Sequence, residues 1–244
     1  MTASKEKISR SEHAAARSGM YRLLAALFRS EPAAALIDQF RHPEFRDALS
    51  SAAFTLPDDF FAEANQQSLT ELEVEYARLF IGPGWHISPH ESVHREDEES
   101  GLYGRSTVKV RQFLETAGFT FQPDYTGLPD HISVEFEFME TLTGREVEAW
   151  ETGDINLAMK CLEIETLFVQ QHLTCWVPDF CTKVAEETEL LFYREIAKLT
   201  RDFIEMEEEH LSTAKHRIPH TNGRDRESIF SQGYSLKHIT ELQK

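Results

Sequence analysis

Apolar residues that recur every three or four positions are the feature of this chain that most restricts its fold. Side chains at that spacing lie on one face of an α-helix, where they can pack into a core. Stripes of this kind run through 16–27, 69–79, 132–139, 157–168 and 192–206. No stretch alternates apolar and polar residues between hairpin turns, as half-buried strands would. The sequence therefore predicts an all-α fold.

Prolines separate these stretches, because proline lacks the backbone N–H that a helix interior uses and its ring clashes with the preceding turn. They lie at Pro32, Pro43, Pro57, Pro83, Pro89, Pro123 and Pro129. The predicted helices span 9–29, 32–40, 57–65, 68–80, 102–117, 130–150, 154–172, 177–187 and 189–209. We expect a single-domain bundle of about nine helices, with Asp130 as the N-cap of the helix that begins there.

Two stretches fall outside the helical pattern. The loop 82–101 is about 20 residues long, which exceeds the usual connection, and long ordered loops tend to be functional. Residues 211–244 have little apolar periodicity, so we expect a loosely ordered tail. The predicted division is a helical domain at 1–210 and a basic tail at 211–244.

The net charge of −17 narrows the range of partners. The tail holds six basic and three acidic residues, a charge of +3, so the body carries −20. A protein of that sign repels polyphosphate and anionic lipid, which argues against binding to nucleic acid or to a membrane surface. It suits a basic partner, although solubility alone could also explain the charge.

The cysteine content and the N-terminus predict a location in the cytoplasm. Three cysteines are too few and too odd in number for a disulfide framework. The polar N-terminus fits neither a signal peptide nor a membrane span.

Trp85 follows a sharp helix stop at Gly82, Pro83 and Gly84. A large aromatic ring in such a loop can anchor a peptide, as aromatic residues do at interface hot spots. The alternative is that the ring folds back onto the core. Leu79 and Phe80 end an apolar stripe, which favours the core over a surface contact.

Pro129, Asp130 and His131 open the helix predicted at 130–150. Proline and aspartate are ordinary helix-start residues, but the positive end of the helix dipole disfavours a charged imidazole there. The histidine is therefore unexplained by capping alone. Glu135 lies four residues after His131, which is close enough for contact on a helix.

A metal site is the alternative interpretation of several histidines. Glu91 with His94, and Glu207 with His210, are Glu-x-x-His pairs such as di-iron helical bundles use. Pro89 interrupts the histidine run, and the second pair has no neighbouring apolar residue to hold it inward, so we predict no bound metal. The run consists of His86, His90 and His94.

No sequence signature of catalysis is present. The chain lacks the phosphate-binding loop, the dinucleotide fingerprint and the Gly-x-Ser-x-Gly nucleophile elbow. These absences predict a binding protein rather than an enzyme.

Three segments, 75–83, 89–93 and 129–138, together resemble the TorD/DmsD/NarJ-type family of redox-enzyme maturation chaperones. The resemblance implies a helical domain that holds the twin-arginine leader of a molybdenum enzyme in a groove between the loop 82–101 and the helix that starts at Asp130. It implies a peptide-binding set of Leu79, Phe80, Trp85, Glu91, Pro129, Asp130, His131 and Glu135.

The same resemblance bears on cofactors and oligomers. We expect no cofactor, although some members of the family bind guanine nucleotide weakly. The protein could be a monomer or a helix-swapped dimer, and the sequence favours neither. The alternatives from other classes are a metal-dependent helical oxidase and an acidic helical adaptor protein.

Overall fold

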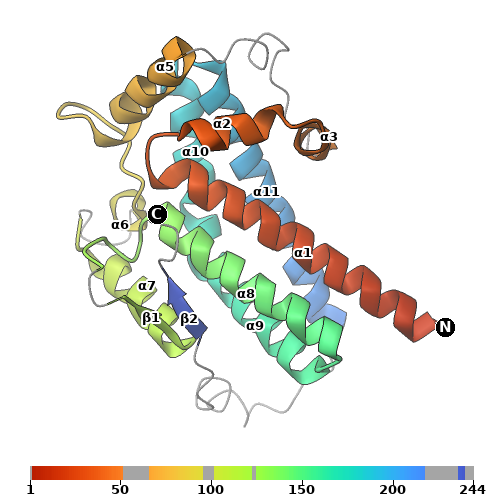
Figure 1. Ribbon diagram of the computed structural model, residues 1–244. Helices are drawn as coiled ribbons and strands as arrows, with labels where there is room; N and C mark the ends of the chain where they lie inside the picture. The colour runs from red at the N-terminus through yellow and green to blue at the C-terminus, as the bar shows by residue number, and fades with distance from the viewer. Residues whose placement is uncertain (1, 52–65, 96–101, 123–124, 218–235, 240–244) are drawn as a thin grey trace.

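The computed structural model describes residues 2–51, 66–95, 102–122, 125–217 and 236–239 (Figure 1). Its regular structure is almost entirely helical, which confirms the all-α prediction. The elements are α1 (Thr2–Arg29), α2 (Ala34–Arg41), α3 (Pro43–Ser51), α5 (Gln66–Tyr76), η1 (Ala77–Ile81), α6 (Glu91–His94), α7 (Arg105–Thr116), β1 (Phe119–Phe121), α8 (Ile132–Thr152), α9 (Ile155–Gln171), η2 (Leu173–Cys175), α10 (Val177–Glu187), α11 (Leu191–Arg217) and β2 (Leu236–Ile239).

Several details differ from the sequence prediction. The predicted helix 57–65 lies outside the described residues, whereas the short helices α3 and α6 were not predicted. Strands β1 and β2 form a short parallel pair, also unpredicted, with Phe119 opposite Leu236. Helix α11 continues to Arg217, into the predicted tail, so the helical part does not end at residue 210.

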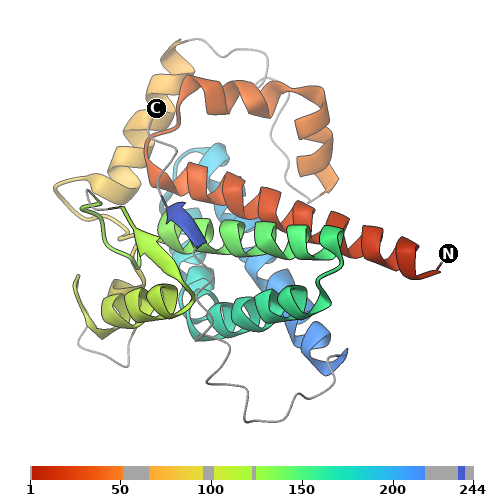
Figure 2. The ribbon, with the colours of Figure 1, turned by 60° about the horizontal axis from the view of Figure 1, so that its bottom comes forward.

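Helices α1 and α8 lie side by side through the middle of the molecule, and α9 packs against α8 (Figures 1 and 2). Helix α11 contacts both α9 and α10. Large aromatic side chains fill the space between these helices and are fully buried. Burying each of them stabilises the fold by about 1.5–3 kcal/mol. They include Tyr21, Phe28, Phe136, Phe168, Trp176 and Phe180.

The turn between α8 and α9 is set by two adjacent residues. Gly153 ends α8 in the left-handed region, with φ of 80°, which glycine adopts without a steric penalty. Asp154 then caps α9, because its carboxylate accepts a hydrogen bond from the Leu157 N–H at 3.0 Å. This turn lays α9 back along α8.

The stripe that begins in α5 ends in a π-helical turn, η1. The Gly82 N–H donates to the carbonyl oxygen of Ala77, five residues earlier, at 2.7 Å. A π turn holds one residue more than an α turn and often occurs near functional sites. Here it places both Leu79 and Phe80 in the core and leaves Ile81 exposed.

A buried arginine joins the four central helices. Arg17 on α1 donates to Glu146 on α8 at 2.8 Å, to Glu165 on α9 at 2.5 Å and to Glu207 on α11 at 2.8 Å. Tyr21 also donates to Glu207, at 2.9 Å. We call these five residues the Arg17 cluster. Every carboxyl group in it receives a hydrogen bond from the same guanidinium.

Burial changes the protonation of this cluster. Loss of hydration raises the pKa of Glu165 to about 8, although the neighbouring Arg17 opposes that shift. Burial raises the pKa of Glu146 in the same way. Three carboxyl groups around one guanidinium exceed its charge, and a proton on Glu165 reduces the excess.

Candidate functional site

The candidate site lies where the loop after η1 crosses the start of α8. The Ile132 N–H donates to the Pro89 carbonyl at 2.9 Å, and the Glu91 N–H donates to the Asp130 carbonyl at 3.0 Å. These two hydrogen bonds fasten the loop and α6 to the first residues of α8. The predicted neighbourhood of the loop and this helix start is therefore present in the structure.

His131, rather than Asp130, is the N-cap of α8, so that prediction was wrong. The His131 Nδ1 accepts a hydrogen bond from the Ser133 N–H at 3.2 Å. Burial lowers the pKa of His131 to about 3, so the ring is neutral and its nitrogen is available as an acceptor. Its ring lies edge-on to that of His90, with 4.9 Å between centroids. Capping rules favoured aspartate because they consider only neighbouring residues and not the packing of His131 against His90 in the loop.

Asp130 turns its side chain toward α6 instead. Its Oδ2 accepts a hydrogen bond from the Ser92 N–H at 3.1 Å, and the residue is 0% exposed. The other carboxyl oxygen, Oδ1, has no hydrogen-bond partner among the described residues. A buried acceptor without a donor is costly, which marks this oxygen as a candidate ligand contact.

Glu135, one turn into α8, is also 0% exposed. Its Oε2 accepts a hydrogen bond from the Trp176 Nε1–H at 3.2 Å. Burial and the neighbouring carboxyl groups of Glu91 and Asp130 raise the pKa of Glu135 well above its usual range. Its Oε1 receives no hydrogen bond from the described parts of the chain.

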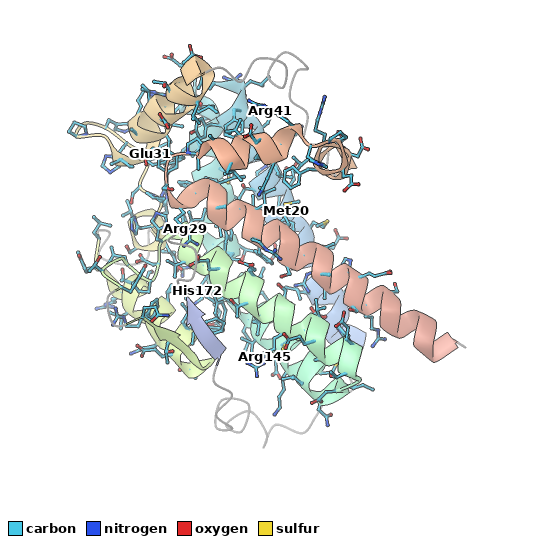
Figure 3. All side chains as sticks on the ribbon, viewed as in Figure 1. Met20, Arg29, Glu31, Arg41, Arg145 and His172 are labelled. Atoms are coloured by element: carbon cyan, nitrogen blue, oxygen red, sulfur yellow. The ribbon has the colours of Figure 1, made fainter. Side chains whose placement is uncertain are left out.

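Among the described residues, Glu91 is the carboxyl group of this site with basic side chains beside it. The His172 Nδ1 lies 2.8 Å from its Oε2, and Arg95 Nη1 lies 3.5 Å from its Oε1. His172 follows α9, and Arg29 at the end of α1 lies at the same end of the molecule (Figure 3). We call Glu91, Ser92, Asp130 and Glu135 the α8-start cluster.

The structure brings five of the eight predicted residues together: Glu91, Pro129, Asp130, His131 and Glu135. The other three lie in η1 and in the loop that follows it. Leu79 and Phe80 are buried in the core, so any peptide contact by them stays a prediction.

Trp85 is 66% exposed, so the alternative in which it folds back onto the core is wrong. Val74 on α5 and Ile81 on η1 are also exposed. The predicted display of an aromatic ring after the helix stop is confirmed.

Sequence reasoning missed Ser92, His172 and Trp176. Each joins the site through contacts between distant segments, since His172 is 81 positions from Glu91 and Trp176 is 41 positions from Glu135. The sequence signal that could have pointed to this site was His172, because a histidine at the end of an apolar helical stripe is unusual in a helix that only packs in a core.

The metal interpretation finds no support in the geometry. Glu91 is bonded to His172, and Glu207 is held by Arg17, so the two Glu-x-x-His pairs do not share a site. The argument that Glu207 would not turn inward was wrong, because it is 0% exposed and Arg17 draws it into the core. Within the described residues, no set of three or more His, Cys, Asp or Glu could hold a metal ion.

In the portion of the chain that the structure covers, none of the helices has the length and apolar character needed to cross a membrane.

Residues 38–182, more than half of the chain, match the family model described as nitrate reductase delta subunit. The chaperone protein TorD of Shewanella pealeana is 24% identical over 213 residues, which cover 81% of this chain and 90% of that protein. TorD of Vibrio vulnificus is 24% identical over 206 residues, covering 80% and 94%. A crystal structure from Archaeoglobus fulgidus, described as a redox enzyme maturation protein, is 20% identical, covers 78% of this chain and 93% of that one, and superposes with a TM-score of 0.49.

Proposed function

This chain belongs to the nitrate reductase delta subunit family, and we propose that it is a cytoplasmic chaperone for a molybdenum-containing oxidoreductase. In this role it binds the twin-arginine leader and the apo-form of that enzyme, assists cofactor insertion and prevents premature export. The resemblance to the TorD/DmsD/NarJ-type family is confirmed by the family match. The prediction that the chain is not an enzyme is also confirmed, since the relatives that it matches are chaperone proteins.

The observation that carries this proposal is the unpaired acceptor oxygens of the α8-start cluster. Asp130 Oδ1 and Glu135 Oε1 are buried and receive no hydrogen bond within the described chain. An arginine guanidinium offers five N–H donors in a planar fork, which suits carboxylate oxygens in this setting. The leader's paired arginines would supply both the missing donors and positive charge.

Exposed apolar side chains on α5, on η1 and in the loop that follows suit the remainder of a leader. The exposed side chains of Val74, Ile81 and Trp85 offer apolar area for a hydrophobic stretch. The strongly acidic body attracts a basic segment and speeds its encounter with the protein. Because Asp130 is fully buried, a peptide reaches it only when the loop 82–90 shifts.

The test is calorimetric titration of the protein with the leader peptide of the molybdenum enzyme encoded beside it. We expect a dissociation constant of micromolar or tighter, and Asp130→Asn should weaken it about ten- to hundredfold, the cost of a lost charge-assisted hydrogen bond. Asparagine keeps an oxygen for the Ser92 N–H, so the melting temperature should not change.

Asp154→Asn is the matched control, because Asp154 is an exposed cap at the start of α9, outside the α8-start cluster. It should leave both binding and melting unchanged. Absence of binding to the leader and to the complete apo-enzyme would refute the chaperone proposal. Equal binding by wild type and Asp130→Asn would move the site away from Asp130, toward Trp85 and its loop.

A further inference from the structure

The carboxyl groups of the α8-start cluster differ in whether a basic side chain lies beside them. Glu91 has His172 and Arg95 beside it. Glu135 has a neutral donor, the Trp176 indole, and its other described neighbours are the acids Glu91 and Asp130. A buried carboxylate with no cation beside it is expensive, so such a group takes up a proton instead.

The geometry gives the carboxylate form of Glu135 little support. The side chain is 0% exposed, Oε2 accepts a hydrogen bond from the neutral Trp176 indole, and Oε1 has no hydrogen-bond partner among the described residues. Burial and repulsion from the acids Glu91 and Asp130 raise the pKa of Glu135 well above its usual range. These conditions favour the protonated form of Glu135.

Three of the histidines around this group carry no proton to release near neutral pH. Burial lowers the pKa values of His90, His94 and His131, so these rings are already neutral. The charged groups facing Glu135 from the surrounding elements are Glu91 and Asp130, with Arg95 and His172 behind Glu91. Only His172 among the histidines is bonded to a carboxylate.

We infer that Glu135 exchanges its proton for a guanidinium of the bound peptide, so that binding at the α8-start cluster releases one proton to solvent. This inference rests on the proposed function and adds its regulation by pH. The Glu135 O–H bond breaks, the proton passes to water, and the carboxylate left behind accepts hydrogen bonds from the arriving arginine. The charge of the occupied cluster is unchanged, because one cation enters as one proton leaves.

Two consequences follow from linkage. The peptide prefers the deprotonated form of Glu135, so its affinity rises with pH, by up to about tenfold per pH unit. A neutral apolar peptide gains nothing from the exchange.

The experiment is calorimetric titration in two buffers, phosphate and Tris, whose protonation enthalpies differ widely. The probe is a synthetic peptide with two adjacent arginines followed by an apolar stretch. The dependence of the measured enthalpy on the buffer gives the number of protons released, which we expect to be about one per peptide for the wild type. In Glu135→Gln it should fall to near zero and the peptide should bind more weakly, because glutamine cannot become a carboxylate.

Glu148→Gln is the matched control, since Glu148 is exposed on the same helix, and it should release protons as the wild type does. The wild-type measurement does not depend on any variant folding. Binding without buffer dependence would overturn the inference and leave the proposed function intact. Release that persists in Glu135→Gln would also overturn it, by assigning the proton to another group such as His172. Absence of binding by this peptide and by the native leader would overturn both.

Discussion

Two buried acidic clusters hold three carboxyl groups each, and they differ in what neutralises them. The Arg17 cluster contains its own guanidinium, which bonds all three carboxyl groups. In the α8-start cluster the basic side chains His172 and Arg95 lie beside Glu91, and Asp130 and Glu135 keep oxygens without a donor in the described structure. Glu165 Oε1 in the Arg17 cluster also lacks a donor there, but each carboxyl group of that cluster is bonded to a guanidinium of the same chain. The α8-start cluster is the one that we propose to receive a cation from outside.

The comparison separates two uses of the same residue types. A closed ion cluster fixes the arrangement of four helices, and breaking it leaves charges buried without partners. In the α8-start cluster, Asp130 and Glu135 each accept a single hydrogen bond from a neutral donor, so we expect each to contribute less to stability than an acid bonded to Arg17. Burial alone therefore does not distinguish an acid that stabilises the fold from an acid that binds a ligand. The hydrogen-bond and ion-pair partners of the acid do distinguish them.

The largest effect should come from removing the guanidinium. Arg17→Met should destabilise the protein by about 3–5 kcal/mol, because three carboxyl groups lose their shared partner. Urea denaturation measures the loss. Arg22→Met is the control on the same helix, since Arg22 pairs with Glu140 while largely exposed, and it should cost about 1 kcal/mol or less. Similar losses for both variants would mean that the Arg17 cluster does not stabilise the fold.

Single carboxyl substitutions should distinguish the clusters next. Glu207→Gln should cost about 1.5–3 kcal/mol, because Glu207 accepts hydrogen bonds from both Arg17 and Tyr21. Glu135→Gln should change stability by less than about 0.5 kcal/mol, since glutamine resembles a protonated glutamate in shape and can still accept from Trp176. Denaturation curves for the two variants test the contrast, which fails if Glu135→Gln is the more damaging.

The pH dependence of stability should report the proton on Glu165. Its pKa of about 8 in the folded protein exceeds the unfolded value, so the folded state binds more protons between the two. The stabilisation that protonated Glu165 contributes is complete below the pKa of this residue in the unfolded chain, and it is lost as the pH rises to about 8. The free energy of unfolding should thus decline from about pH 5 to about pH 8. The decline should be less steep in Glu165→Gln than in the control variant Glu163→Gln, which changes a neighbouring glutamate on the same helix. Parallel profiles for the two variants would exclude Glu165 as the source.

The smallest effect should come from chelation. We expect purified protein to contain no stoichiometric transition metal, because each Glu-x-x-His glutamate is already bonded within the chain. Dialysis against EDTA should leave the melting temperature and the peptide affinity unchanged. Iron or zinc at one ion per chain or more after that dialysis would restore the metal-dependent oxidase as the leading hypothesis.

Periodicity in the sequence was sufficient to predict the helical architecture. Each long helix presents an apolar stripe, and proline or glycine ends most of them, so local rules suffice. The same rules failed for β1, which has only three residues, and for β2, which pairs with it across more than 100 positions. Such pairing depends on tertiary contacts that a local pattern does not contain.

The candidate site was predicted only in part, for a similar reason. Asp130 and Glu135 could be named from the segment that opens α8, but their acceptor oxygens depend on Ser92 and Trp176, which lie far away in sequence. Arg17 was not predicted as a buried residue at all. A charged residue in a helix is expected to be exposed to solvent, and the local sequence does not show that three glutamates from other helices surround this one.

The π turn at η1 sets the direction in which the following loop leaves the helix. Its extra residue amounts to a one-residue insertion between α5 and Gly82. Deleting one residue there would restore α-helical register and rotate the following segment by roughly 100° about the helix axis. Trp85 would then point in another direction, and the hydrogen bonds by which Pro89 and Glu91 hold the start of α8 would be lost or re-formed elsewhere. The length of this one turn therefore couples the display of the aromatic ring to the position of the acids.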